Sequence, residues 1–231
     1  MSGLVARSVV LHQWEISPFC QKVARMLRFK GIQFDVVNYN GILGAKVPML
    51  SKAGKVPVLD INGQRIQDST RIARYLDEAF PDAPLLYPKD PIQKAYAELW
   101  EDWADELLYF YEIHLRVNDP DALKEAIRIS SIGRPAYERA LVKNFIKFEL
   151  KTQLFFQGTG RMNSQDIEFE FRKHLDRIEL MVAQTGWLVG NCQTIADIAV
   201  AAQLGEVLRT SKQFGGEIMR RPVLAAWYSK Q

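Results

Sequence analysis

The stretch that decides the fold is SVVLHQWEISPFCQKVARMLRFKG, residues 8–31. Its apolar run from Val9 to Leu11 predicts a buried strand over residues 8–14. Pro18 suits the first position of a helix, where its missing N–H leaves no helical hydrogen bond unmade. Gly31 is typical of a residue that ends such a helix. A buried strand that runs directly into a helix predicts an α/β unit.

The residues up to about 80 continue this alternation of strand and helix patterns. Further strands are predicted at 33–38, 56–61 and 64–67, with Gly63 marking a tight turn between the last two. Asp68-Ser69-Thr70 is a helix-start signal. The predicted order is therefore βαβ followed by ββα, with a right-handed crossover in the first unit.

After this region, prolines at positions 81, 84, 88 and 91 predict an ordered linker. Beyond it no convincing strand pattern appears. Long amphipathic stretches predict helices over 92–117, 121–156, 164–184 and 195–210, with Gly133 and Pro135 expected to break or bend the second. We therefore predict an α/β domain over residues 1–80, a linker over 81–90 and an all-helical domain over 91–231.

The composition excludes several classes of function. The chain has 231 residues and a net charge of +3, which is too small to indicate a nucleic-acid partner. No apolar run approaches the ~18 residues of a membrane span, and the N-terminus lacks a secretory signal. The two cysteines and three scattered histidines give no metal-binding spacing. We expect a cytoplasmic protein with reduced thiols, no metal, and no nucleic-acid or membrane partner.

The segment WEISPFC, residues 14–20, carries the first candidate for chemistry. It joins a buried strand to a helix N-terminus, where free N–H groups and the helix dipole stabilise an anion. The Ser17 hydroxyl at this place can donate a hydrogen bond to a thiolate or a phosphate. The alternative is that Ser17 is a simple N-cap, which is the commonest role of serine at a helix start.

Two later segments carry similar signals. Pro57 suits a bend at the start of a strand, and a cis Val56–Pro57 bond would expose the backbone of Val56 to a ligand. Ser69 at a helix start can bind a carboxylate with its hydroxyl and backbone N–H, and Asp68 can pair with an amine. Plain capping is again the alternative for Asp68 and Ser69.

Taken together, the order and spacing of these three segments resemble the N-terminal domain of the cytosolic glutathione transferase superfamily, in its serine-type, bacterial-like form. The resemblance implies a thioredoxin-like domain that binds glutathione as co-substrate. It places Ser17 at the catalytic position, Val56-Pro57 at the cis-proline position and Asp68-Ser69 at the γ-glutamyl end. Lys55 lies where many classes have Gln or Lys near the glycine end.

The resemblance extends into the helical region. The segment from Trp187 to Asp197 looks like the one that leads into the family's buried central helix, and Thr194 with Asp197 would form a capping box. Arg221-Pro222 to Trp227 is similar to a common C-terminal pattern. The resemblance implies a helical glutathione transferase domain and a homodimer. Residues 91–185 carry no motif that can be assigned.

The chemistry suggested by the resemblance depends on positions 17 and 20. Ser-Pro-Phe-Cys is a thioredoxin-type C-P-x-C motif whose first cysteine is replaced by serine, and Cys20 is expected to be a buried, inert thiol. We therefore expect Ser17 to stabilise the glutathione thiolate for conjugation to small hydrophobic electrophiles, as in detoxification, with peroxidase or isomerase side activities. The second substrate is expected to contact aromatic residues, namely Trp14, Phe19, Trp103, Tyr109, Phe110 and Tyr111.

Two alternatives remain open at this point. The same fold can serve as a non-catalytic glutathione-binding or protein-interaction module, because fold alone does not determine function. A thiol transferase that uses Cys20 as a redox thiol is the second alternative.

Overall fold

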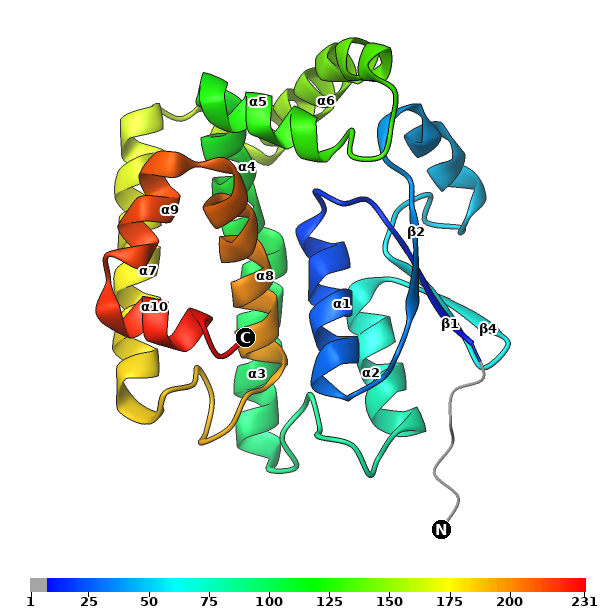
Figure 1. The fold of residues 1–231 in the computed structure, drawn as a ribbon. Helices are drawn as coiled ribbons and strands as arrows, with labels where there is room; N and C mark the ends of the chain where they lie inside the picture. Colours follow the sequence, from blue (N-terminus) through cyan, green and yellow to red (C-terminus); the bar gives the residue numbers. More distant parts are fainter. Residues whose placement is uncertain (1–7) are drawn as a thin grey trace.

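The computed structural model describes residues 8–231. Four strands form one mixed sheet in the order β2-β1-β3-β4 (Figure 1). The strands are β1 (Val9–Gln13), β2 (Asp35–Asn38), β3 (Val58–Ile61) and β4 (Gln64–Gln67). β1 pairs with β2 in parallel and with β3 antiparallel, and β3 pairs with β4 antiparallel.

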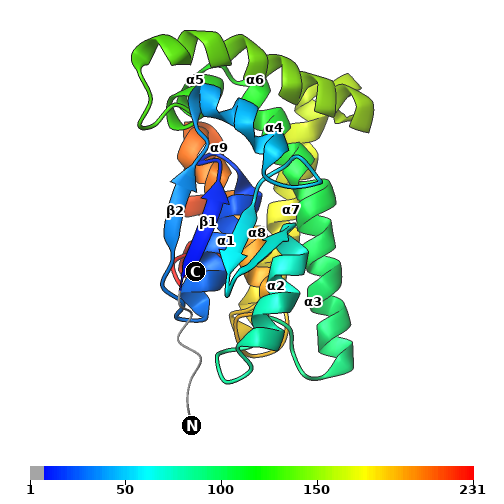
Figure 2. The same ribbon diagram turned by 90° about the vertical axis from the view of Figure 1, so that its right-hand side faces the viewer.

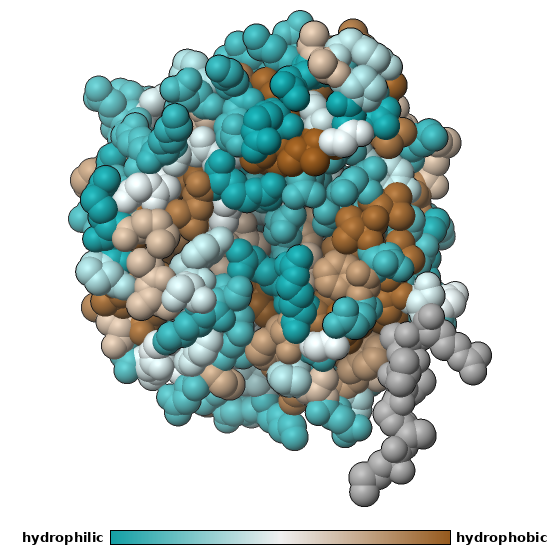
Figure 3. Space-filling view, viewed as in Figure 1, coloured by the Kyte–Doolittle hydropathy of each residue, from teal (hydrophilic) through white to brown (hydrophobic). Residues whose placement is uncertain are grey.

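Two helices belong to this sheet. Helix α1 (Pro18–Phe29) connects β1 to β2, and helix α2 (Ser69–Ala79) follows β4. The βαβ and ββα units are therefore those predicted, and this part of the chain has the thioredoxin-like fold. β2 is an edge strand on which Val36 and Val37 stay exposed, and the space-filling view shows an apolar area there (Figure 3).

The described residues after β4 contain helices and no strand. The α-helices are α3 (Pro91–Trp103), α4 (Tyr109–Asn118), α5 (Pro120–Ile129), α6 (Ala136–Gln157), α7 (Ser164–Thr185), α8 (Ile195–Thr210), α9 (Lys212–Met219) and α10 (Pro222–Tyr228). A π-helical turn, η2 (Ala104–Leu108), joins α3 to α4, and a short 3₁₀ helix, η3 (Thr159–Arg161), follows α6. No helix among residues 8–231 has the length and apolar character needed to cross a bilayer.

The observed elements differ from the predicted ones at a few places. The segment before β3 forms a 3₁₀ helix, η1 (Gly41–Met49), which the sequence pattern did not indicate. β3 begins at Val58 rather than at residue 56, because its ladder to β1 starts with the pair His12 and Val58. The long helix predicted over 121–156 is divided into α5 and α6, and Gly133 with φ of 74° lies in the break, as anticipated.

Helix α8 lies at the centre of the molecule, and nearly all of its side chains are buried. The predicted capping box is present at its start, where Thr194 Oγ1 accepts from the α8 backbone and the Asp197 carboxylate accepts from Thr194 N at 3.0 Å. Asp197 also accepts from Leu188 N and from Trp227 Nε1, each at 2.9 Å. This carboxylate therefore fixes α8 against α10 and has a structural role.

The α5–α6 pair lies across the end of the sheet at which α1 begins (Figures 1 and 2). Hydrogen bonds tie it to the segment after β2: Gly41 N donates to Ser130 O at 2.8 Å, and Ile42 N donates to Glu138 Oε2 at 3.0 Å. Trp14, in the β1–α1 loop, packs against Ala126 and Ile129 of α5. These contacts cover the loop that carries Ser17.

Candidate functional site

Three loops meet at one end of the sheet. The register pairs His12 near the end of β1 with Val58 at the start of β3, and Val58 in turn with Gln67 at the end of β4. The residues that follow β1, precede β3 and follow β4 therefore emerge at the same edge. These are the segments that contain Ser17, Val56 and Asp68-Ser69. Helices α1 and α2 both start here, so two positive dipole ends favour an anionic ligand at this edge.

Ser17 is the N-cap of α1. Its backbone is extended, and its Oγ accepts from Cys20 N at 3.4 Å. Ser17 therefore caps the start of α1, which is the alternative role considered for it from the sequence. A serine hydroxyl has one donor hydrogen besides two acceptor lone pairs, so a capping Ser17 keeps its hydrogen for a further acceptor. The side chain is half-buried and remains reachable.

The loop that carries Ser17 is held from several sides. Ser17 N donates to Trp14 O at 2.9 Å, and Glu15 N donates to Asn40 Oδ1 at 3.1 Å. Glu15 O accepts from Gln21 Nε2 and from Arg209 Nη1, each at 3.2 Å. Arg209 lies on α8, so the helical region directly fixes the loop at the sheet edge.

Cys20 is fully buried one turn into α1. Burial raises the pKa of its thiol to about 12, which keeps it protonated at neutral pH. A thiol that is protonated and shielded is a poor nucleophile. This agrees with the expected inert role of Cys20 and weighs against a redox function for it.

The two other segments have the backbone features of a binding edge. The Val56–Pro57 peptide bond is cis, as predicted. Asp68 has φ of 78°, an uncommon conformation for a residue other than glycine, and such residues gather at ligand sites. Its exposed carboxylate accepts from Arg71 N at 3.0 Å, which caps α2. Ser69 is buried, and its hydroxyl makes no hydrogen bond to another residue within 8–231.

Lys55 is exposed beside Val56, and the helical region faces it. Burial raises the pKa of Glu149 on α6, and the charge of Lys55 opposes that shift. Gln153 connects Glu149 to Tyr109, because its Nε2 donates to Glu149 Oε1 at 3.4 Å and its Oε1 accepts from Tyr109 Oη at 3.1 Å. A polar row on α6 and α4 therefore lies near the sheet edge.

The structure divides the predicted aromatic residues into two groups. The Phe19 and Tyr109 rings have centroids 5.0 Å apart, and Phe110 and Trp14 pack on the same small cluster between α4 and α6. These four residues lie beside the start of α1 and can contact a second substrate.

Trp103 and Tyr111 lie elsewhere. Their rings contact His174 on α7, with centroid distances of 5.2 and 4.8 Å. Tyr111 is two residues after Tyr109, so the two side chains are about 200° apart around α4. We correct the expected pocket accordingly: Trp103 and Tyr111 belong to the packing between the helices. Burial lowers the pKa of His174 to about 4, which fits a packing role for this histidine.

A buried polar network lies between α4, α8 and the loop at the sheet edge, and the sequence patterns did not indicate it. Arg116 forms a salt bridge with Glu112 and lies 4.0 Å from Glu206, while Arg209 pairs with Glu206 at 2.9 Å and with Glu15 at 3.2 Å. Burial raises the pKa values of Glu112 and Glu206 to about 7. Glutamates inside amphipathic helices look like surface residues in a sequence, which is why this network was missed.

These two glutamates predict a pH dependence of stability. A carboxyl group whose pKa is raised on folding stabilises the fold below its unfolded value, near 4.5, and loses that contribution as pH rises to its folded value. We expect Glu206→Gln to lose less free energy of unfolding than the wild type between pH 5 and pH 8, as measured by urea denaturation. Glu78→Gln, exposed on α2, is the control and should behave as the wild type. Equal slopes for the Glu206 variant and the wild type would contradict the assignment.

Known proteins resemble this chain both in the sheet region that carries the site and in the overall fold. Residues 11–84 match the model of the glutathione S-transferase N-terminal domain. Glutathione S-transferase U8 of Arabidopsis thaliana is 31% identical over 146 residues, which are 62% of this chain and 61% of that protein. Glutathione S-transferase U22 of the same plant is 34% identical over 109 residues, which are 46% and 49% of the two chains. The chain thus spans about half the length of the curated relatives it matches.

Solved structures match nearly the whole chain. The β-etherase LigF of Sphingobium sp. strain SYK-6 has a TM-score of 0.69 at 21% identity, covering 96% of this chain and 94% of that one. A glutathione S-transferase of Rhodospirillum rubrum has a TM-score of 0.67 at 20% identity, covering 96% and 86%. A rice glutathione transferase in complex with glutathione has a TM-score of 0.64 at 20% identity, covering 99% and 87%. Residues 11–84 therefore match a glutathione S-transferase N-terminal domain, and the thioredoxin-like sheet followed by helices has the fold of the solved glutathione transferases.

Proposed function

We propose that this protein is a glutathione transferase that binds glutathione at the edge of the sheet and stabilises its thiolate with Ser17. The observation that carries the proposal is the meeting of Ser17, Val56 and Asp68-Ser69 at one edge, beside two helix N-termini. The relatives named glutathione S-transferase support the same activity.

The proposed clamp assigns one part of glutathione to each segment. Val56 offers its backbone groups to the cysteinyl part, because neither is engaged in the β1–β3 ladder, which begins at Val58. Asp68 and Ser69 hold the γ-glutamyl end, where the carboxylate of Asp68 meets the amine and Ser69 meets the carboxylate. Lys55, exposed at the same edge, reaches the glycine carboxylate.

The second substrate is a small apolar electrophile that contacts the aromatic residues near the start of α1. Phe19, Tyr109, Phe110 and Trp14 support this part of the proposal, because they form an apolar cluster next to Ser17. The cluster is compatible with many electrophiles. A panel of aryl halides, enones and peroxides assayed with glutathione identifies the class.

The alternatives make different predictions. A non-catalytic binding module would retain glutathione without ionising its thiol. A Cys20-dependent thiol transferase requires a reactive thiolate, and the burial of Cys20 weighs against it. The decisive measurement is retention on immobilised glutathione followed by the ultraviolet difference spectrum of bound glutathione. A thiolate band at neutral pH is expected, and binding without that band would favour the module.

We further propose that the chain forms a homodimer and functions in the cytoplasm. Helix α3 supports the dimer, because Ile92, Tyr96 and Leu99 are exposed at a spacing that places them on one face. Sedimentation equilibrium at micromolar concentration is expected to show a dimer, and Leu99→Asp is expected to shift it to monomer. A Glu98→Ala variant on the same helix serves as a control. A wild-type monomer would overturn the proposal.

A further inference from the structure

Helix α6 carries an apolar stripe that no other described element covers. Its large apolar side chains recur along one side of the helix, and each is more than half exposed. They are Tyr137, Leu141, Phe145, Phe148, Phe155 and Phe156. At 3.6 residues per turn these positions fall within about 100° around the helix. A contiguous exposed stripe of this kind marks an interaction surface rather than ordinary scatter.

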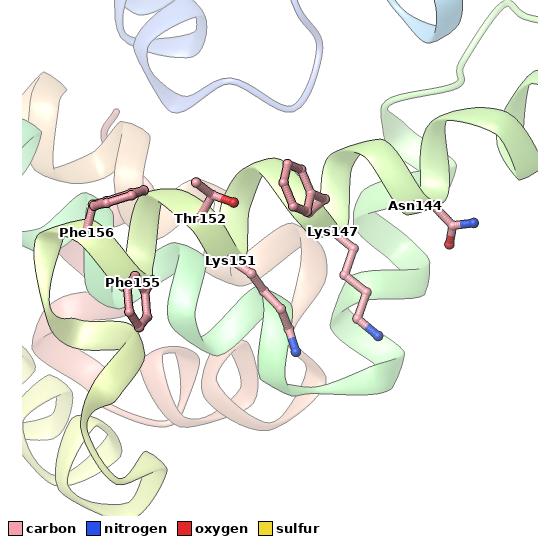
Figure 4. Close-up of a pocket in the computed structure, with 7 residues that line it drawn as sticks. Asn144, Lys147, Lys151, Thr152, Phe155 and Phe156 are labelled. Atoms are coloured by element: carbon pink, nitrogen blue, oxygen red, sulfur yellow. The ribbon is translucent and has the colours of Figure 1, made fainter.

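A row of lysines borders the stripe. Lys143, Lys147 and Lys151 are exposed and follow one another at intervals of four residues. The close-up shows Lys147 and Lys151 extending from the same side of α6 as Phe155 (Figure 4). Between these lysine and phenylalanine side chains lies a shallow hollow of about 510 Å³.

The exposed charge of α6 is positive only. The helix contains two acidic residues, and neither offsets the lysines at the surface. Glu138 is fully buried and pairs with Arg134 at 2.6 Å. Glu149 is half-buried and faces Gln153 and Lys55. A partner that covers this face must therefore be both apolar and anionic.

A second copy of the chain fits this requirement poorly. If two copies of α6 packed stripe to stripe in the antiparallel sense about a two-fold axis, the lysine row of one copy would face the lysine row of the other. These like charges would repel each other. If the two copies packed in the parallel sense, the lysine row would face the opposite flank of the stripe, where the only acidic residue is the half-buried Glu149. Nucleic acid also fits poorly, because strand-binding proteins use a positively charged groove, whereas α6 is a projecting helix (Figure 2).

We propose that this face of α6 docks on the surface of an anionic lipid bilayer. Helices that lie in the plane of a membrane combine bulky apolar residues on one side with basic residues at its border. The aromatic stripe enters the boundary between headgroups and acyl chains, and the lysine row meets the lipid phosphates and carboxylates. The inference goes beyond the proposed enzymatic function and does not depend on it. It revises the expectation, drawn from the sequence, that no membrane is involved.

The test is co-sedimentation of the full chain with phosphatidylcholine vesicles that contain phosphatidylserine. Each basic residue near an anionic surface strengthens binding roughly fivefold, so Lys147→Gln/Lys151→Gln should weaken it about thirtyfold at low salt. Phe148→Ser/Phe156→Ser should abolish it. The matched control, Lys52→Gln/Lys89→Gln, removes the same charge from exposed positions outside α6 and should bind as the wild type.

Three results would overturn the proposal. The first is no sedimentation of the wild type with anionic vesicles, and the second is an equal loss of binding in the Lys52→Gln/Lys89→Gln control. The third is a dimer in sedimentation velocity that Phe148→Ser/Phe156→Ser converts to monomer without any vesicle binding, since a second copy would then be the occupant. All substituted side chains are exposed, so unchanged circular dichroism and thermal melting are expected to accompany each variant.

Discussion

Ser17→Ala is expected to lower conjugation of glutathione at neutral pH by roughly tenfold or more. A free thiol has a pKa of about 8.5, and a drop of ~2 units corresponds to about 2.7 kcal/mol of preference for the thiolate. One hydrogen bond to a charged group contributes roughly 1.5–3 kcal/mol, and a helix N-terminus adds up to about 1 kcal/mol. The Ser17 hydroxyl and the first turn of α1 are thus sufficient, without a general base.

The variant should therefore raise the pKa of the bound thiol by about one to two units. Activity is then expected to recover in part as pH rises, because more of the glutathione is ionised without help from the protein. Glutathione affinity should change little, since Val56, Asp68 and Ser69 supply most of the proposed binding. The measurements are a pH profile of conjugation, a thiolate titration by ultraviolet absorption, and calorimetry of glutathione binding.

Ser69→Ala is the counterpart that separates binding from ionisation. It should weaken glutathione binding by about tenfold or more and leave the pKa of the bound thiol unchanged. Ser229→Ala, exposed on the far C-terminal turn, is the control.

If Ser17→Ala keeps the conjugation rate and the thiol pKa of the wild type, Ser17 is only the cap of α1. The backbone amides alone would then support the thiolate.

Ser17→Cys tests the same position from the opposite direction. It restores the C-P-x-C pattern and places a thiol at the exposed end of α1, where the dipole favours the thiolate. Activity should shift from conjugation toward thiol transfer through mixed disulfides, in which the new thiolate attacks the disulfide sulfur and a thiolate leaves. An assay of glutathione release from a mixed disulfide is expected to detect this. No gain of thiol transfer would contradict the proposed accessibility of position 17.

Local patterns in the sequence were enough to predict the sheet and its edge. The run from Val9 to Leu11, the helix start at Pro18 and the segment Asp68-Ser69 each predict a structure through residues close together in the chain. Once the strand order is assumed, the antiparallel ladder brings the segments of the site to one edge. The positions of Ser17 and Ser69 in the fold could therefore be predicted.

The contacts that fix this edge could not be predicted in the same way. Glu15 meets Arg209 only because α8 packs beside the β1–α1 loop, and 194 positions separate the two residues. Tyr109 and Tyr111 look equivalent in the sequence, yet the helix turns them toward different neighbours. The 3₁₀ helix at Gly41–Met49 has little periodicity in its apolar residues, so no sequence pattern indicated it.

Lys22→Met is expected to cause the largest loss of stability, about 3–5 kcal/mol. Lys22 lies on α1 and is almost fully buried, and its Nζ is 2.6 Å from Glu101 Oε1 on α3 and 2.6 Å from Asp105 Oδ2 on η2. Glu101 also accepts from Thr70 Oγ1 at 2.9 Å and from Tyr87 Oη at 2.7 Å. The substitution leaves two carboxylates buried without their cation, and chemical denaturation measures the result.

The loss of unfolding free energy in Lys22→Met should be larger at high pH than at low pH. Burial raises the pKa of Asp105 to about 6, although the charge of Lys22 opposes the shift. Without Lys22 the buried Asp105 carboxyl group must take up a proton on folding or remain charged in an apolar environment. Protonation costs little near pH 5 and much more at neutral pH, so the difference between variant and wild type should shrink as pH falls from about 8 to about 5.

A companion variant keeps this prediction testable. Lys22→Met/Glu101→Gln/Asp105→Leu removes both charges along with the lysine, and it should recover much of the lost stability, because a buried ion network can be replaced by neutral groups at little net cost. The exposed Lys212→Met should stay within about 0.5 kcal/mol of the wild type. A Lys22→Met protein as stable as the wild type at pH 8 would show that water reaches the cluster. Lys22 on α1 and Thr70 on α2 both bind Glu101 on α3, so the cluster holds the starts of α1 and α2 at a fixed distance from each other. A stable Lys22→Met protein would show that this spacing does not depend on the cluster.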